Sequence, residues 1–219
     1  NNASVLNTIL KEHPRLMIDG IWGLAELTYD PEDKHINMTN FRPFQLSNIK
    51  IEESTFFCIG AGGAGRAICS VLAYYGAKKI YIANRTLSKA QTLVDDINRN
   101  FAPVAELVDL NDINLLKEKI KESDVVMNNT GLGMPSSLDG TPIPKEYLHS
   151  GQLCFDATYN PSKTRFLIEA EEMGCSIMNG LGMSLYQGAE QIELWSGKTA
   201  PIEAMRQELM NILAGKKEE

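Results

Sequence analysis

The chain reads Gly60-Ala61-Gly62-Gly63-Ala64-Gly65 between an apolar run at 55–59 and a helical pattern at 66–75. A G-x-G-x-x-G stretch that follows a strand and opens a helix is typical of a dinucleotide-binding turn. The first glycine suits a tight turn, the second lets the backbone approach a diphosphate, and the third lets the helix pack closely on the strand. Free N–H groups at the helix N-terminus attract phosphate. A flexible Gly/Ala turn without a ligand is the alternative interpretation.

Strand and helix patterns alternate along the chain from residue 51 onward. This alternation predicts one α/β domain over 51–219, with a doubly wound parallel sheet of the Rossmann type covered on both faces. The expected strand order is 3-2-1-4-5-6, with ligand at the carboxyl ends of the strands near the switch point. Strands are expected at about 55–60, 79–83, 105–109, 124–128, 153–156 and 176–179, and helices at about 63–75, 87–98, 113–120, 162–173, 183–196 and 201–213.

Residues 1–50 differ from the rest of the chain and are predicted to form a separate N-terminal segment. Val5 to Leu10 carry a short helical stripe, and 16–24 is an apolar, glycine-broken stretch that suits a strand pair or a docking segment. The stretch 28–43 is polar and turn-rich, and residues 32–35 within it are expected to form a solvated loop. The segment is too short for an independent domain, so we expect a remnant or a partner-docking element.

Composition narrows the class of protein. The 219 residues are 43% hydrophobic and 22% charged, with a net charge of -7, which disfavours a nucleic-acid-binding surface. There is no apolar run that could span a bilayer and no signal-peptide pattern at the N-terminus. The four cysteines form no C-x-x-C motif and are expected to be reduced and buried, without a metal site. A cytoplasmic protein without membrane or nucleic-acid partners is expected.

The end of the second predicted strand indicates which dinucleotide is bound. An NAD site usually places an acidic residue about 20 residues after the glycine turn, to bind the ribose hydroxyls. Here the chain has Asn84-Arg85-Thr86, followed by Lys89. The planar guanidinium of Arg85 can hold a 2′-phosphate, and Asn84 and Thr86 can add hydrogen bonds. The sequence therefore predicts NADP rather than NAD.

Five motifs in the same order resemble the cofactor domain of the shikimate/quinate dehydrogenase family, over about residues 51–214. Two are the glycine turn and the Asn84-Arg85-Thr86 stretch. A third resembles the family's Asn-Ala-Thr-x-x-Gly-Met loop. The remaining two resemble its Asp-x-x-Tyr-x-Pro-x-x-Thr element and its Gly-x-x-Met…Gln-x-Ala helix. The last three motifs stand at residues 128–134, 156–164 and 180–189.

The resemblance implies a site as well as a fold. It implies hydride transfer between NADP and shikimate, 3-dehydroshikimate or quinate, with Gln187 and Tyr159 toward the substrate. The cofactor-binding residues implied by the motifs are Gly60, Ala61, Gly62, Gly63, Ala64, Gly65, Asn84, Arg85, Thr86, Lys89, Thr130, Gly131, Ala157, Gly180 and Met183.

Gln187 also stands out from its helix pattern. Helical spacing places Leu185, Ala189 and Ile192 on one predicted packed face, while Gln187 lies on another side. Gln187 is therefore expected to point away from the sheet, toward whatever covers the cleft. A plain surface glutamine is the alternative.

The resemblance also implies a Lys-Asp pair for proton transfer, carried by an N-terminal substrate domain that is not recognisable here. Lys11, Asp19, Asp30 and Lys34 are present, but no spacing singles them out, so the catalytic residues are unassigned. The expected partner is a small-molecule substrate, together with a missing substrate domain or a second copy in a homodimer. Two other functions stay open: a nucleotide-binding regulatory module without its catalytic half, and another small-molecule NADP dehydrogenase.

Overall fold

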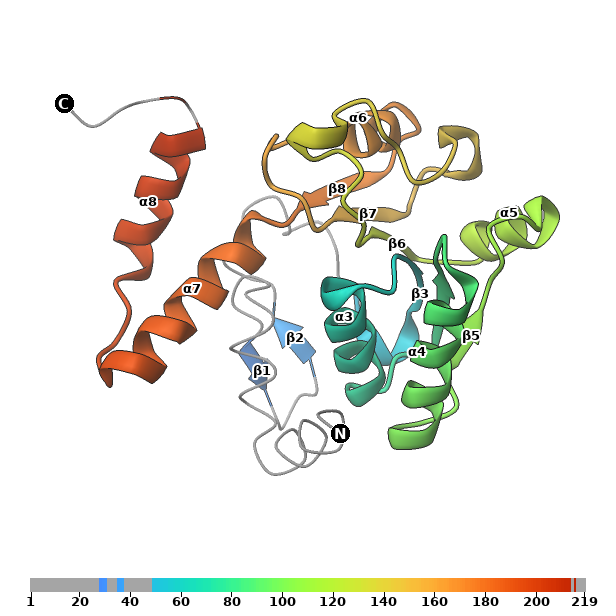
Figure 1. The fold of residues 1–219 in the computed structure, drawn as a ribbon, viewed down its shortest axis with the longest axis horizontal. Coiled ribbons are helices and arrows are strands. Elements are labelled where there is room, and N and C mark those ends of the chain that lie inside the picture. Colours follow the sequence, from blue (N-terminus) through green and yellow to red (C-terminus); the bar gives the residue numbers. More distant parts are fainter. Residues whose placement is uncertain (1–27, 31–34, 38–48, 214, 216–219) are drawn as a thin grey trace.

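The computed structural model describes residues 28–30, 35–37, 49–213 and 215. Its centre is a six-stranded, entirely parallel sheet in the order β5-β4-β3-β6-β7-β8 (Figure 1). This is the order predicted from the sequence, and the doubly wound fold is confirmed. The strands are β3 (Thr55–Ile59), β4 (Lys79–Ala83), β5 (Ala105–Leu107), β6 (Val125–Asn128), β7 (Leu153–Asp156) and β8 (Ser176–Asn179).

The described residues form six α-helices, five of which come after a strand and one of which, the last, comes after another helix. Figure 1 shows α3 and α4 on one side of the sheet, with α5 and α6 nearer the other. The helix expected at about 87–98 is present, and it buries one face that carries Ala90, Leu93, Val94 and Ile97. The helices are α3 (Gly63–Tyr74), α4 (Leu87–Asn100), α5 (Ile113–Lys121), α6 (Arg165–Glu172), α7 (Leu181–Ser196) and α8 (Ile202–Leu213), and the short 3₁₀ turns are η2 (Ile51–Glu53), η3 (Pro135–Ser137) and η4 (Lys145–Tyr147).

The sheet separates two hydrophobic clusters. Successive side chains of a strand point to opposite faces, and every residue of β3 is buried. Phe56 and Cys58 join the cluster under α3 and α4, while Phe57 and Ile59 join the cluster under α5 and α6. A central strand covered on both faces explains why this part of the sequence is a continuous apolar run rather than an alternating one.

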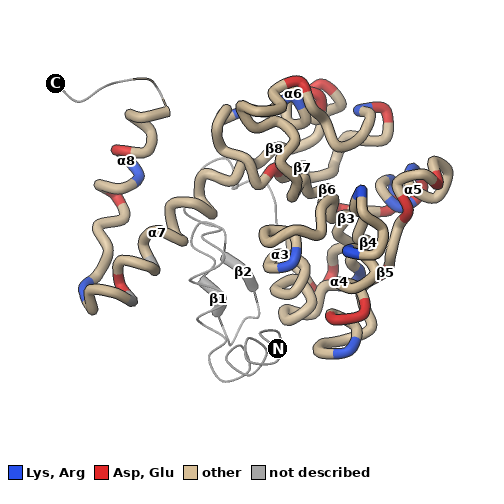
Figure 2. Tube along the Cα trace, viewed as in Figure 1, with Lys and Arg blue, Asp and Glu red and all other residues tan. Residues whose placement is uncertain are grey.

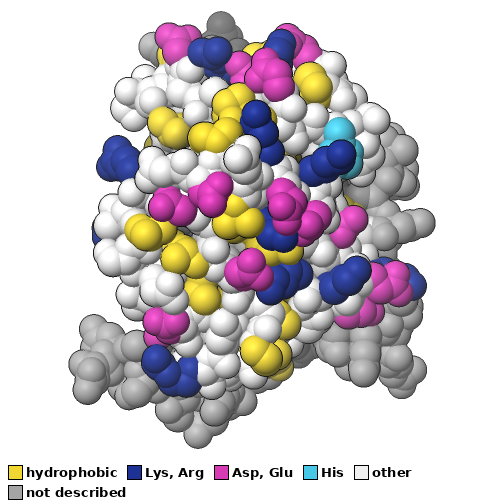
Figure 3. Space-filling model, turned by 90° about the vertical axis from the view of Figure 1, so that its right-hand side faces the viewer, with side chains coloured by type: hydrophobic (Ala, Val, Ile, Leu, Met, Phe, Trp, Pro, Cys, Tyr) yellow, Lys and Arg dark blue, Asp and Glu magenta, His cyan; other side chains and the backbone are white. Residues whose placement is uncertain are grey.

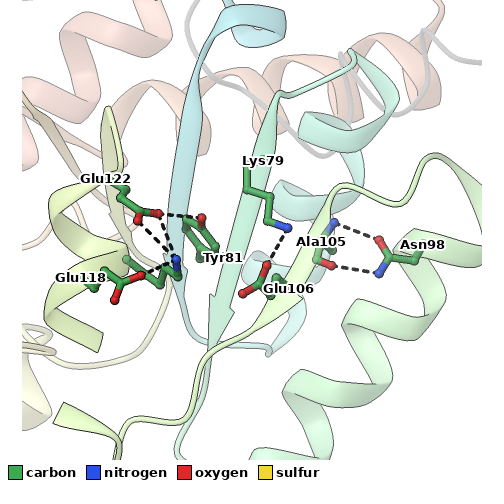
Figure 4. Close-up of polar contacts among 8 residues, drawn as sticks. Lys79, Tyr81, Asn98, Ala105, Glu106, Glu118 and Glu122 are labelled. Atoms are coloured by element: carbon green, nitrogen blue, oxygen red, sulfur yellow. Dashed lines mark hydrogen bonds and ion pairs between the residues drawn. The ribbon is translucent and has the colours of Figure 1, made fainter. Parts of the chain in front are cut away.

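A group of polar contacts ties α5 to the sheet (Figure 4). The Tyr81 hydroxyl on β4 donates to Glu122 Oε2 over 2.9 Å, and Lys119 Nζ donates to the same carboxylate over 3.2 and 3.3 Å. Lys79 forms an ion pair of 2.6 Å with Glu106 and lies 5.7 Å from the centre of the Tyr81 ring. These contacts connect β4, β5 and the C-terminal end of α5 around one buried tyrosine.

Charged residues are spread over the helices and the loops of the described chain. Figure 2 shows acidic and basic positions on α5 and α6, whereas α7 is mostly uncharged. In Figure 3, acidic and basic side chains are interspersed with apolar ones over the visible face. In the described part of the chain, no helix has the length and apolarity that crossing a membrane would require. All four cysteines are free and buried, as predicted.

The prediction of a solvated loop over 32–35 is wrong at its last residue, because His35 lies in a strand. Residues Thr28–Asp30 (β1) and His35–Asn37 (β2) form an antiparallel pair. Main-chain hydrogen bonding between the two strands is compatible with polar side chains, which is why composition alone did not indicate it. The predicted helix at 5–10 and the apolar stretch at 16–24 lie outside the described residues.

Candidate functional site

The glycine turn lies at the carboxyl edge of the sheet, where β3 meets β6. Gly60 has φ +109°, a conformation that favours glycine, and its N–H donates to Ala83 O over 2.8 Å. A Cβ on Gly65 would stand 1.9 Å from Gly60 O. A Cβ on Gly60 would stand 2.8 Å from Asn129 O. The first and last glycines therefore allow the strand, the helix and the loop after β6 to pack without a side chain between them.

The middle of the turn is open. Gly62 and Gly63 are exposed, and a Cβ built on either would meet no atom within 4 Å. Gly62 is the N-cap of α3 and offers no side chain to the N–H groups of the first helical turn. These groups and the helix dipole attract an anion, and the absence of side chains lets the anion approach the backbone.

The residues predicted to choose the dinucleotide lie beside this turn. Asn84 Oδ1 accepts a hydrogen bond of 3.1 Å from the Ala61 N–H, and Asn84 Nδ2 donates to Thr86 O over 2.9 Å. Asn84 thus connects the glycine turn to the loop after β4. Arg85, Thr86 and Lys89 are exposed. The loop presents two cations and a hydroxyl next to the open end of α3.

A buried polar network, which the sequence patterns did not predict, supports the loops after β6 and β7. The Asp156 carboxylate is fully buried and accepts from Asn128 Nδ2 (2.9 Å), Thr164 Oγ1 (2.7 Å) and the Thr158 N–H (2.8 Å). Burial raises the pKa of Asp156, while its hydrogen bonds with Thr164, Thr158 and Asn128 act in the opposite direction. The sequence did contain a sign of this network, because the apolar strands β6 and β7 each end in a polar residue, Asn128 and Asp156.

The network reaches the cofactor loop through Asn128. Its Oδ1 accepts from both the N–H (3.1 Å) and the hydroxyl (2.6 Å) of Thr130, whose hydroxyl in turn accepts from the Leu132 N–H over 3.1 Å. A Cβ on Gly133, which has φ +93°, would stand 2.9 Å from Thr164 Cβ. The loop that contains Thr130 and Gly131 is therefore built directly on the start of α6.

The loop after β7 contacts the start of α7. A Cβ on Gly180 would stand 2.0 Å from Ala157 O, and the Gly180 N–H donates to Thr158 O over 3.1 Å. Tyr159 is half-buried in the same loop. The helix expected from about residue 162 begins later, at Arg165. The side chain of Thr164 is its N-cap and accepts a hydrogen bond from the Leu167 N–H.

Helix α7 presents the remaining predicted residues. Leu185 and Ala189 are buried, as predicted, while Gln187 and Met183 are half-buried. Ile192 is 37% exposed, so its assignment to the packed face is wrong. The reason is that α7 extends beyond the sheet, as Figure 1 shows, and its distal half packs against α8. A Cβ on Gly188 would stand 3.3 Å from Met205 Cε of α8.

The described residues do not bring a proton-transferring pair to this edge. Lys11, Asp19 and Lys34 lie outside the described residues, and Asp30 ends β1. Within the described ranges, no group of three or more His, Cys, Asp or Glu side chains could hold a metal ion.

Known proteins are similar to this chain in sequence and fold. Family models for shikimate/quinate 5-dehydrogenase and for the shikimate 5′-dehydrogenase C-terminal domain match residues 44–135 and 180–210. An NADP(+) shikimate dehydrogenase of Natronomonas pharaonis is 40% identical over 172 residues, which are 78% of this chain and 61% of that protein. The chain thus spans about 60% of the length of this relative.

Two solved structures agree with these matches. Shikimate 5-dehydrogenase from Listeria monocytogenes, in complex with shikimate and NAD, has a TM-score of 0.70 and 37% identity over 77% of this chain and 60% of that one. The Thermus thermophilus enzyme, in complex with NADP(H) and shikimate, has a TM-score of 0.60 and 29% identity over 71% and 54% of the two chains. By motif order, sheet topology and these matches, the chain belongs to the shikimate/quinate dehydrogenase family.

Proposed function

We propose that this chain is the cofactor-binding part of an NADP-dependent oxidoreductase that interconverts shikimate and 3-dehydroshikimate, or acts on quinate. The observation that carries the proposal is the open glycine turn joined through Asn84 to a loop with exposed Arg85 and Lys89. The choice of substrate and cofactor is supported by the Thermus thermophilus enzyme, which was solved with NADP(H) and shikimate, and by the NADP(+) shikimate dehydrogenase of Natronomonas pharaonis. A cytoplasmic location belongs to the same proposal.

The residues present fit the cofactor. The first turn of α3 would hold the diphosphate, and Arg85, Thr86 and Lys89 would hold the 2′-phosphate by charge and hydrogen bonds. Thr130, Gly131, Ala157, Gly180 and Met183 line the opposite loops in this proposal. When bound, NADP would accept the hydride. The protein has to orient the substrate and to take up the proton that leaves its hydroxyl group. Gln187 and Tyr159 would orient the substrate ring.

The proposal includes a partner. No residue in the described ranges has been placed in proton transfer, and the chain spans about 60% of its relative's length. We therefore include a substrate domain that completes the site, with a homodimer as the second arrangement. The exposed apolar side chains at the far end of α7 and on α8 agree with a covered surface there, since Trp195 is 83% exposed.

Titration of both dinucleotides tests the cofactor assignment. Replacing Arg85 with Ala should weaken NADP binding by about 1.5–3 kcal/mol, the range for a hydrogen bond to a charged group, and leave NAD binding nearly unchanged. Calorimetric titration measures both affinities. Arg99→Ala is the matched control, because Arg99 is an exposed arginine on α4 that pairs with Asp96. Equal losses for NADP and NAD would show that Arg85 does not contact the 2′-phosphate.

A nucleotide-binding regulatory module is the second candidate function. It is favoured by the absence of an identified proton-transferring pair among the described residues. Oxidation of shikimate or quinate by the complete protein decides between the two functions, because a regulatory module would bind NADP without turnover.

A further inference from the structure

Asn129 follows β6 and lies against the glycine turn. Its N–H donates to Ile59 O over 2.8 Å, which places it beside the end of β3. The residue is 7% exposed, and within the described part of the chain neither polar atom of its side chain makes a hydrogen bond. Its neighbour Asn128 uses both polar atoms of its amide. Asn129 also stands where the family pattern quoted above has Ala.

An unpaired buried amide is unfavourable. The great majority of buried polar side-chain atoms in folded proteins have a hydrogen-bond partner, because a group removed from water without one keeps its desolvation penalty. A residue such as Leu would fill a similar volume without this penalty. We therefore expect the amide of Asn129 to form a hydrogen bond with a group that is not among the described residues.

The neighbourhood of Asn129 indicates what that partner is. Asn129 Cβ lies 3.6 Å from the position that a Cβ on Gly65 would take, in the first turn of α3. The N–H groups of this turn receive no side-chain cap, and Gly62 and Gly63 stand open. An unpaired amide donor thus lies beside several main-chain donors. An anion with several acceptor oxygens satisfies both sets of donors.

We propose that Asn129 is a diphosphate-binding residue. When the diphosphate of a dinucleotide lies at the N-terminus of α3, rotation about the side-chain bonds of Asn129 lets Nδ2 donate to a phosphate oxygen. This inference rests on the proposed function, because it requires a dinucleotide at this site. Asn129 then contacts the group that NADP and NAD share, whereas Arg85 contacts the 2′-phosphate that only NADP carries.

Asn129→Leu tests the inference, because leucine keeps a similar volume and removes both polar atoms. We expect the affinities for NADP and NAD to fall by the same factor, roughly tenfold, as for a lost hydrogen bond to a charged group. The thermal midpoint without nucleotide should stay equal or rise, since the unpaired amide is gone. Asn129→Ala, the residue in the family pattern, repeats the affinity test if leucine does not fit. Titration calorimetry and thermal unfolding give the two readouts.

The outcomes separate this inference from the proposed function. Unchanged affinities, a loss confined to NADP, or a loss accompanied by lower thermal midpoints in both variants would overturn the role of Asn129 alone. A wild-type chain that binds neither dinucleotide would overturn the proposed function and this inference together. Asn114→Leu on α5, at an exposed position, is the control and should change neither affinity.

Discussion

At the scale of single residues, the site depends on positions where a side chain cannot be added. Gly60, Gly65 and Gly180 each bring main chain of one element within 3 Å of the place where a Cβ of another would stand. Gly62 and Gly63 differ, since a Cβ there would meet open space. Within one short motif, some glycines serve packing of the protein and others leave room for a ligand.

Gly65→Ala should destabilise the fold. The new Cβ would lie 1.9 Å from the main-chain oxygen of Gly60, so the turn or the helix has to move. Overpacking of this kind typically costs about 1–3 kcal/mol or more. The free energy of unfolding, measured with urea, reports the loss. Gly63→Ala is the matched control and should leave stability nearly unchanged; a similar loss in both variants would refute the packing role of Gly65.

At the scale of elements, α5 is held on the sheet by polar contacts as well as by apolar packing. The side chain of Gln152 is buried, and its Nε2 donates to Ile120 O and Ser123 O, each over 2.8 Å. Ile120 lies in the last turn of α5 and Ser123 lies just after the helix, where main-chain donors for the carbonyls become few. The adjacent Glu122 accepts hydrogen bonds from Tyr81 of the sheet and from Lys119 of α5 (Figure 4).

The Glu122 contacts predict a dependence of stability on pH. Hydrogen bonds from Tyr81 and Lys119 lower the pKa of Glu122. A carboxyl group with a lowered pKa contributes stability above its unfolded pKa, about 4.3, and loses it as the pH falls through the folded value. The contribution should stay below about 1 kcal/mol, because the Glu122 side chain is 46% exposed.

Urea unfolding of the wild type and Glu122→Gln over a pH series measures this effect. The wild type should be the more stable protein at neutral pH, and the difference should shrink as the pH falls below about 4. Glu52→Gln, at an exposed position of η2, is the control and should show no such difference. A difference that grows toward acid pH would contradict the assignment.

At the scale of the whole molecule, the proposed cofactor binding and the proposed catalysis depend on different parts of the protein. The described residues place an open glycine turn at the edge of a six-stranded parallel sheet, and the chain spans about 60% of the length of its relative from Natronomonas pharaonis. The proposed substrate contacts, Tyr159 and Gln187, come from the loop after β7 and from α7 and lie in the part that is present.

Residues 1–219 should therefore bind NADP and turn over slowly with shikimate or quinate. General acid–base assistance is typically worth about 10²–10⁴ in rate, so its absence should be plain in a steady-state assay of NADPH formation. Binding of NADP, measured in parallel, is the control for a folded site. Turnover at the rate of a full-length relative would show that a residue in 1–50 carries out the proton transfer.

The sequence by itself determined the sheet order, the glycine turn and the basic loop after β4. Apolar periodicity, turn residues and the spacing between Gly60 and Arg85 are local features, and local rules are sufficient to interpret them. The same rules separated Gln187, which is half-buried, from the buried residues Leu185 and Ala189.

Only the tertiary structure decided the contacts between distant segments. Asn128 and Asp156 are 28 residues apart and meet because β6 and β7 are neighbours in the sheet. Ile192 is exposed because α7 extends past the sheet, which its helical pattern does not show. The amide of Asn129 is unpaired because the loop after β6 packs on the glycine turn. Whether a polar group is paired depends on all the elements around it, so spacing along the chain does not contain that information.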